Sequence, residues 1–282
     1  MSLKHFYNSE YLDSLKIGIL GKNEESYFDK YFEHNSSFLK GEVVSYAFNY
    51  IANDNSDADV LNYYKSGDLG GYNIFINFKG NNWTSELQQA FVDASEFLSD
   101  TITGDIPNFW LIDDVYISAS LNNIDGSGGV LGQAGAWLLR PSSSLPAAAF
   151  MQFDTADAND FNDAGTWDDI VLHEMLHSIG FSSNIWARLG LISGNWTDSP
   201  YFTGQNAKIA YEALFGADAS LGVPLEEDGG IGTAYSHWDE EIFDNELMTG
   251  FINDDNYLSD MTIAALEDMG YDTVFDASDY VV

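Results

Sequence analysis

The amino-acid sequence predicts an α+β fold, because segments with strand-like alternation are interleaved with segments of helical spacing. Apolar and polar side chains alternate through 72–78, which favours a strand. Apolar side chains recur every three or four residues through 83–98, which favours a helix. The chain has 282 residues, of which 45% are hydrophobic and 15% aromatic, so it can bury a substantial core.

Three further strands are predicted beyond this first strand and helix. Segments 114–121 and 147–153 have strand-like composition, and the short apolar run 136–139 is predicted to be an edge strand. A glycine-rich stretch at 126–132 joins them. It lacks the Gly-Lys-Ser/Thr ending of a phosphate-binding loop, so we interpret it as a surface turn.

The two ends of the chain carry weaker signals. A helix at 24–32 and a strand at 42–50 are expected near the N-terminus, where no residue pattern indicates chemistry. Toward the C-terminus, helices are predicted at 207–214 and 259–269, with Gly270 as the cap of the second. Between Gly180 and His237 the chain is expected to be mostly irregular.

The charge of the chain excludes some classes of function. The net charge is −35, and beyond position 80 the only basic side chains are those of Arg140, Arg188 and Lys208. Such a surface repels nucleic acid and anionic membranes. It could attract Ca²⁺, although an acidic, well-solvated surface needs no bound cation. There is no cysteine, so the fold has no disulfide and a metal site would use histidine or carboxylate ligands.

The strongest chemical signal is the pattern His-Glu-x-x-His formed by His173, Glu174 and His177. Residues four apart on a helix lie about 40° from each other around its axis, so the two imidazoles can hold one metal ion. Glu174 is rotated by about 100° from His173, which suits a base acting on a water at the metal rather than a ligand. Chance occurrence of so short a pattern is the alternative, but two of only five histidines fall at this spacing.

The pattern lies in a segment that is predicted to be helical. Thr166 and Asp169 have the spacing of a capping box at its start. Apolar residues follow at helical intervals, and Gly180 offers a stop just after the second histidine. We therefore predict one helix that runs through His177.

A catalytic zinc ion usually has three protein ligands, so a third must come from elsewhere in the chain. Glu212, on the helix predicted at 207–214, is one candidate. A ligand six residues after His177 is absent, because that position is Ser183. The remaining candidate is His237, which is followed eleven residues later by Met248.

The zinc-site segments carry a resemblance to a known family. They are His-Glu-x-x-His-x-x-Gly-Phe at 173–181, Ser-His-Trp at 236–238 and Asn-Glu-Leu-Met-Thr-Gly at 245–250. Together they resemble the leishmanolysin family of metzincin zinc proteases. The resemblance extends over 72–272, whereas residues 1–70 show none.

The resemblance implies a role for each matching residue. It implies that the zinc ligands are His173, His177 and His237, that the general base is Glu174, that Gly180 allows a sharp turn after the helix, and that Met248 is a structural residue of the Met-turn. It also implies a metzincin-like α+β fold, in which a mixed twisted sheet packs on a backing helix and on the active-site helix. An irregular C-terminal subdomain would bring the third ligand across a cleft.

The same resemblance implies a zinc endopeptidase that acts on proteins or peptides, with one catalytic Zn²⁺. We expect residues 1–70 to be an N-terminal extension or prosegment and 71–282 to be the catalytic domain, divided at about 181. No membrane span or signal peptide is visible, and surface-type members of the family carry disulfides and an anchor that this chain lacks. We therefore expect a secreted, bacterial-type relative. The alternative is a secreted binding or adhesion module with a non-catalytic zinc site.

Overall fold

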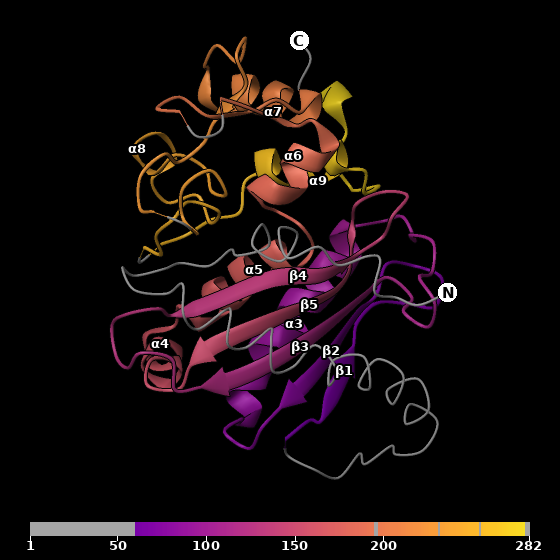
Figure 1. Cartoon of the computed structure of the whole chain (residues 1–282), viewed down its shortest axis with the longest axis vertical. Helices are drawn as coiled ribbons and strands as arrows, with labels where there is room; N and C mark the ends of the chain where they lie inside the picture. Colours follow the sequence, from indigo (N-terminus) through magenta and orange to yellow (C-terminus); the bar gives the residue numbers. More distant parts are fainter. Residues whose placement is uncertain (1–59, 195–196, 231, 254, 280–282) are drawn as a thin grey trace, which may run out of the picture.

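The computed structural model describes residues 60–194, 197–230, 232–253 and 255–279 (Figure 1). The helix expected at 24–32 and the strand expected at 42–50 lie outside these residues. The described chain forms a sheet with helices packed on it, followed by a C-terminal part of shorter elements. None of the described helices has the length and apolar character needed to cross a membrane.

The larger sheet has five strands in the order β1-β2-β3-β5-β4. They are β1 (Tyr63–Lys65), β2 (Ile74–Lys79), β3 (Val115–Asn122), β4 (Gly132–Leu139) and β5 (Pro146–Asp154). The central strands β2, β3 and β5 are parallel, while β1 and β4 pair antiparallel at the two edges. The predicted α+β class with a mixed sheet is therefore confirmed. Because β1 joins this sheet, the sheet begins before residue 71.

Within the described residues, the strands predicted at 72–78, 114–121 and 147–153 are present, and the run predicted to be an edge strand forms the end of β4. A register shift between Ala136 and Leu138 bends β4 where it pairs with β5. No other described strand pairs with the outer edge of β4.

The long predicted helices are also present. These are α3 (Ser85–Thr101), α5 (Trp167–Ser178), α7 (Gln205–Phe215) and α9 (Asp260–Met269). Gly270 caps α9 in the left-handed conformation that was expected of it, with φ 104°. Two short helices that periodicity did not reveal are α4 (Ala158–Ala164) and α6 (Ser183–Leu189), because seven residues are too few to show a period.

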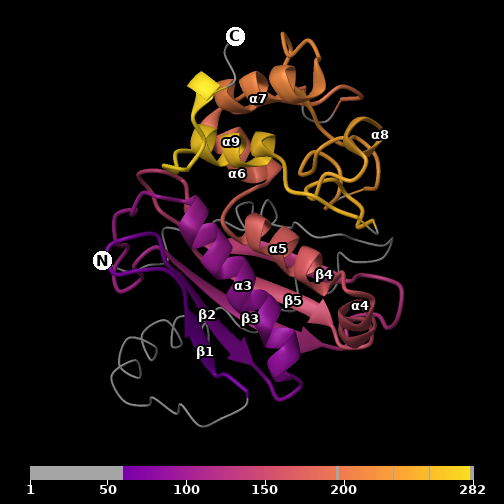
Figure 2. The ribbon, with the colours of Figure 1, turned by 180° about the vertical axis from the view of Figure 1, so that it is seen from behind.

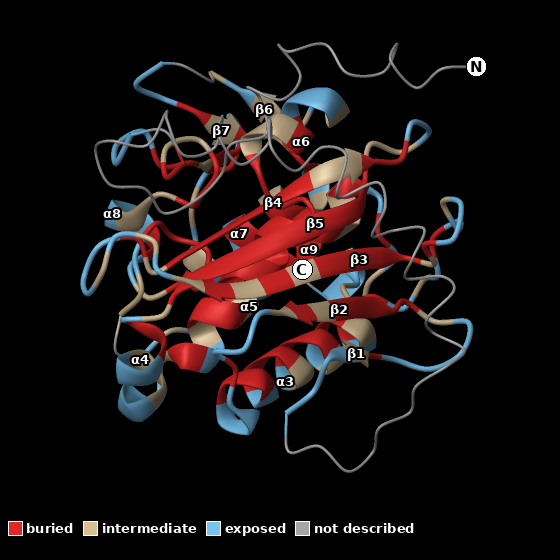
Figure 3. Cartoon of the chain, turned by 60° about the horizontal axis from the view of Figure 1, so that its bottom comes forward, coloured by how far each residue is buried: buried red, intermediate tan, exposed pale blue. Residues whose placement is uncertain are grey.

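The main core lies between the sheet and two helices. Figure 2 shows α3 and α5 side by side on one face of the sheet. Aromatic rings join the layers there, with ring centroids 5.5 Å apart for Phe91 and Phe153 and 4.9 Å apart for Phe153 and Trp167. The indole of Trp167 donates a hydrogen bond to the carbonyl of Leu87. Burial is continuous along the sheet, and exposed residues gather in the connecting loops (Figure 3).

The C-terminal part contains more regular structure than the sequence suggested. Its remaining elements are β6 (Ile192–Ser193), β7 (Tyr201–Phe202), β8 (Val223–Pro224), α8 (Glu240–Phe243) and the 3₁₀ helix η2 (Ala277–Asp279). The three short strands form a second antiparallel sheet. A second aromatic cluster lies under it, in which Trp186 packs on Phe181, Phe202 and Trp238. This cluster fixes the segment that carries His237.

Candidate metal centre

Helix α5 begins at the predicted place but without the predicted capping box. Thr166 occupies the N-cap position, yet its side chain makes no cap hydrogen bond, and its buried hydroxyl has no partner. The reason is the backbone, whose φ of −111° and ψ of 1° differ from the extended conformation usual at an N-cap. The hydrogen bond from Ile170 N to Thr166 O begins the helix instead.

Helix α5 ends just before a glycine that is needed for the turn. Gly180 has φ of 110°, a conformation that favours glycine. A Cβ added there would lie 3.1 Å from side-chain atoms of both Met269 and Pro146. The chain reverses at this point, so that Phe181 N donates to Leu176 O. The carbonyl of Phe181 thereby reaches His177, as described next.

Three imidazoles meet at one point. The Nε2 atoms of His173 and His177 are 3.0 Å apart, as are those of His177 and His237, and those of His173 and His237 are 3.2 Å apart. Each Nδ1 donates to a backbone carbonyl, namely Leu247 O for His173, Phe181 O for His177 and Thr233 O for His237. Carbonyl oxygens only accept, so every Nδ1 carries the proton and every Nε2 presents a lone pair.

This arrangement fits a zinc ion. Zinc–imidazole bonds of about 2.0–2.1 Å in a tetrahedron place the ligand nitrogens about 3.3 Å apart, close to the separations found here. All three side chains are buried, and burial lowers the pKa of His173 to about 4 and that of His237 to about 3. Burial, followed by the neighbouring imidazoles, also lowers the pKa of His177 well below its usual value. The imidazoles are therefore neutral at pH 7, as metal ligation requires.

Glu174 lies beside this triad with both carboxylate oxygens buried and without a hydrogen-bond partner among the described residues. Burial raises its pKa to about 8. A Cβ added at Gly132, the first residue of β4, would lie 3.1 Å from Cγ of Glu174. The absence of a side chain at Gly132 thus gives Glu174 its space, and it places the start of the edge strand next to the metal centre.

The candidates for the third ligand differ in their positions. His237 completes the group of three histidines, whereas Glu212 is exposed on α7 and accepts a hydrogen bond from Ala219 N. Ser183, at the position where a nearby ligand is missing, instead hydrogen-bonds to Ser236 through both its backbone N and its hydroxyl. That contact ties the start of α6 to the residue preceding His237.

A family model for leishmanolysin matches residues 122–281, which include all of these histidines. This chain belongs to the leishmanolysin family. The family implies zinc as the metal for the triad. The match begins at residue 122, so the resemblance expected over 72–121 stays a prediction.

Relatives of this leishmanolysin-family chain cover only part of it. It is 34% identical over 107 residues to a leishmanolysin homolog of Crithidia fasciculata, an alignment covering 36% of this chain and 16% of the relative. It is 42% identical over 66 residues to a leishmanolysin-like peptidase of Caenorhabditis elegans, in an alignment that covers 23% of this chain and 10% of the relative. It is 29% identical over 108 residues to leishmanolysin of Leishmania major, in an alignment that covers 36% of this chain and 18% of the relative. The chain spans less than a fifth of these eukaryotic relatives, which lend no support to a bacterial source.

Two functional features of this leishmanolysin-family site could not be identified from residue types. The backbone carbonyls that hold the imidazoles leave no sequence signal, because every residue has one. Glu246, within the Asn-Glu-Leu-Met-Thr-Gly run, is fully buried beside Met248, which is itself buried. Nothing in an acidic chain distinguishes one buried glutamate from many solvated ones.

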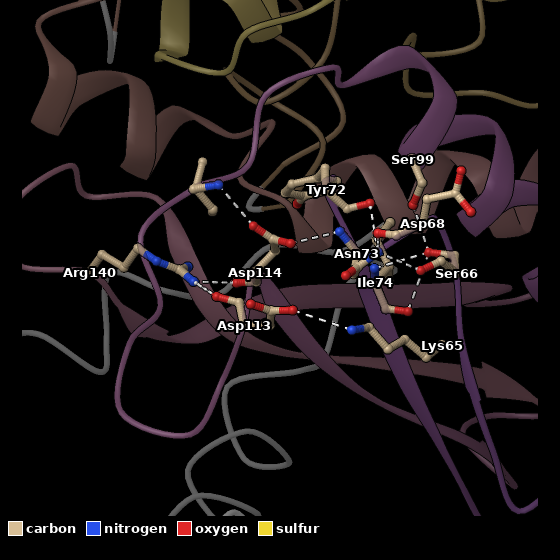
Figure 4. Close-up of polar contacts among 11 residues, drawn as sticks. Lys65, Ser66, Asp68, Tyr72, Asn73, Ile74, Ser99, Asp113, Asp114 and Arg140 are labelled. Atoms are coloured by element: carbon tan, nitrogen blue, oxygen red, sulfur yellow. Dashed lines mark hydrogen bonds and ion pairs between the residues drawn. The ribbon is translucent and has the colours of Figure 1, made fainter. Parts of the chain in front are cut away.

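Apart from the three histidines, a cluster of acidic residues lies just before β3. It consists of Asp105, Asp113 and Asp114. The carboxylate of Asp114 accepts hydrogen bonds from Asn73 N and Ile106 N (Figure 4). Burial, opposed by these hydrogen bonds, raises its pKa to about 6. The carboxylate of Asp113 pairs with Lys65 at 3.3 Å. These contacts give the cluster a structural role, and they provide no support for the Ca²⁺ site that the acidic composition allows.

Proposed function

We propose that this chain is a zinc-dependent endopeptidase of the metzincin type, which hydrolyses peptide bonds of extracellular proteins or peptides. One observation carries the proposal: three Nε2 lone pairs converge within 3.2 Å, and an unpartnered buried carboxylate lies alongside. When a fold brings the Nε2 lone pairs of buried, neutral imidazoles together, a bound cation relieves the repulsion between those lone pairs. A carboxylate buried without a partner is costly unless it has chemical work to do.

His173, His177 and His237 would hold the ion, with the hydrogen bonds at their Nδ1 atoms setting the orientation of each ring. When bound, zinc supplies Lewis acidity, which lowers the pKa of a water and polarises the carbonyl under attack. Three protein ligands leave a position for that chemistry, whereas a structural zinc site is usually closed by a fourth. Among the described residues, the group that could hold the metal consists of three histidines.

Glu174 would act as the general base. It takes a proton from the attacking water as the water oxygen bonds to the peptide carbon, and it then passes this proton to the amine nitrogen as the carbon–nitrogen bond breaks. Burial raises the pKa of Glu174 to about 8, so the group exchanges protons near neutral pH. An acid–base group is most effective when its pKa lies close to the working pH.

The substrate would lie as an extended strand along the outer edge of β4. This edge has no described strand partner, and its first residue, Gly132, adjoins Glu174. Backbone hydrogen bonds to a sheet edge recognise a peptide irrespective of most of its side chains. The edge strand was predicted at 136–139, and the position of Gly132 favours the beginning of β4 for this contact.

The remaining expectations belong to this proposal. Secretion agrees with the negative charge but has no further support. The division into residues 1–70, as an N-terminal extension or prosegment, and a catalytic domain likewise stays a prediction. A calcium site stays a prediction without support. The alternative of a binding or adhesion module with an inert zinc site is one outcome of the experiment below.

The test compares the zinc-loaded protein with its Glu174→Gln variant on a diverse peptide library, with products identified by mass spectrometry. We expect cleavage by the wild type, zinc stoichiometry unchanged in the variant, and activity lowered by roughly 10²–10⁴-fold through loss of general acid–base catalysis. Glu212→Gln, a change at an exposed glutamate of α7, is the matched control and should keep full activity.

Full activity of Glu174→Gln would refute the role of this carboxylate. Absence of cleavage by a wild type with zinc confirmed present would contradict the endopeptidase proposal and favour the binding module.

A further inference from the structure

Glu246 is a fully buried carboxylate that accepts four hydrogen bonds. One oxygen accepts from Met248 N at 2.5 Å, and the other accepts from Ser259 N, from the Ser259 hydroxyl and from the Thr262 hydroxyl. The carboxylate therefore joins two segments, the turn that contains Met248 and the first turn of α9. Burial raises its pKa, whereas these hydrogen bonds oppose that effect. It makes no ion pair among the described residues.

The first segment leads to His173. Leu247 lies between Glu246 and Met248, and its carbonyl accepts the hydrogen bond from Nδ1 of His173 at 2.8 Å. The backbone of Leu247 is held on the other side by its N–H, which donates to Tyr257 O at 2.8 Å. Because the carboxylate fixes Met248 N, it fixes the peptide unit that contains the Leu247 carbonyl. The orientation of the His173 ring thus depends on Glu246.

The second segment leads to His237. The indole N–H of Trp238 donates to the hydroxyl oxygen of Thr262 at 2.8 Å, so the hydroxyl hydrogen of Thr262 is free to donate to Glu246. Trp238 also donates its backbone N–H to Met248 O at 2.9 Å. The two contacts hold the residue next to His237 against the first turn of α9 and against the turn that contains Met248. The carboxylate of Glu246 is therefore connected, through one or two hydrogen bonds, to the groups that hold His173 and His237.

We propose that Glu246 is a positioning residue, which orients His173 through the Leu247 carbonyl and His237 through Thr262 and Trp238, and thereby sets the affinity and geometry of the metal site. The proposal rests on the zinc site of the proposed function but not on peptidase activity. A carboxylate suits this place because it only accepts hydrogen bonds, and each of the neighbouring N–H and O–H groups can donate one to it. A glutamine amide would turn an NH₂ group toward one of these donors, leaving a buried N–H unpaired.

The test uses the full chain and its Glu246→Gln variant, and it measures the dissociation constants of Zn²⁺ by competition with a chelator. Partners of metal-bound histidines change affinity by about 10–100-fold when they are lost, and we expect weakening in that range. The visible absorption spectrum of the Co²⁺-substituted protein reports ligand geometry, and we expect its bands to shift. Thermal unfolding of the metal-free protein measures the general loss of stability separately.

Asp268→Asn is the matched control, because Asp268 belongs to the same helix α9 and its carboxylate also accepts backbone hydrogen bonds, from Asn206 N and Ala207 N. Figures 1 and 2 show α9 alongside α7, whose first turn these bonds hold. This variant should lose stability while keeping the zinc affinity and the cobalt spectrum of the wild type. If Glu246→Gln does not fold, Thr262→Val removes one of the two connections and should still weaken zinc binding.

The proposal would be overturned if the folded Glu246→Gln variant kept the zinc affinity and the cobalt spectrum of the wild type. If Glu246→Gln does not fold, the same result in Thr262→Val would overturn it. An equal loss of affinity in Asp268→Asn would also overturn it, since the effect would then be a general loosening of α9. If the wild type binds zinc but cleaves no peptide, the proposed function fails while this proposal stands. If the wild type binds no zinc, both fail.

Discussion

The part of the chain up to the turn at Gly180 and the part that follows it are built in different ways. The first is organised by a five-stranded sheet whose apolar side chains pack with α3 and α5, in a core that continues into the second part. The second has helices without a large sheet, strands of two residues, and isolated bridges such as Leu225 with Trp238 and Trp238 with Thr249. Its interior contains polar side chains, among them His237, Glu246 and Thr262.

The metal centre lies where these two parts meet. The first part contributes two imidazoles from α5, which ordinary helix formation aligns. The second part contributes His237 and also the carbonyls of Thr233 and Leu247 that orient two of the rings. Regular structure thus supplies a rigid base, and irregular structure supplies the distant contacts that complete the site. Changes in the apolar core of the first part should therefore affect stability more than metal binding, and changes in the second-part residues that hold the imidazoles should do the reverse.

The largest expected effect comes from His237→Ala, which removes the proposed third ligand. Zinc sites bind with about 10–16 kcal/mol, so losing one ligand of the set should cost roughly 3–5 kcal/mol and weaken zinc binding by more than 10²-fold. Equilibrium dialysis with metal analysis measures this loss, and far-UV circular dichroism checks that the sheet remains. Retention of one zinc per chain in this variant would mean that another residue serves as the third ligand.

A change in the first part should have the opposite profile. Phe91 is fully buried in contact with Phe78, Trp83, Phe153 and Trp167, so Phe91→Ala should lower the free energy of unfolding by about 3–5 kcal/mol. Denaturant unfolding measures the loss. The zinc affinity of the folded variant should match that of the wild type, and a clear drop would show that the two parts are more tightly coupled than their construction indicates.

The smallest effect concerns the pH dependence of the metal-free protein. The three imidazoles have lowered pKa values in the folded protein. As the pH is lowered toward and below 6.5, the unfolded chain therefore binds protons that the folded chain does not, and the free energy of unfolding decreases. Between pH 7 and pH 6 the loss should be roughly 0.7 kcal/mol for each imidazole, about 2 kcal/mol in all.

The raised pKa of Glu174 acts in the other direction, because it disfavours folding as the pH rises from about 4.5 to about 8. The measurement is therefore best made in the Glu174→Gln background, with urea unfolding at each pH. Saturating zinc should raise the stability at each pH without removing the dependence, because the folded imidazoles stay unprotonated and the unfolded histidines still take up protons. A metal-free protein whose stability is unchanged from pH 7 to pH 6 would contradict the buried, neutral state of the triad.

Sequence patterns were most informative where structure is periodic. Alternation located β2, and helical spacing located α3, α5, α7 and α9, because side chains of one face repeat locally along a regular backbone. Strand-like composition located β3 and β5. The capping box at Thr166 failed because its geometry depends on a backbone conformation that the preceding turn sets. The helices α4 and α6 were missed because they are short.

The sequence by itself determined that His173, Glu174 and His177 share one helix and can serve one metal, since their spacing alone sets their directions. It also narrowed the third ligand to a few residues. Only the tertiary structure brought His237 to the other two imidazoles, gave every Nδ1 its carbonyl partner and buried Glu246 between the segments that support His173 and His237. These features depend on contacts between residues as many as 74 positions apart, and such contacts are decided by packing and by the need to satisfy buried polar groups.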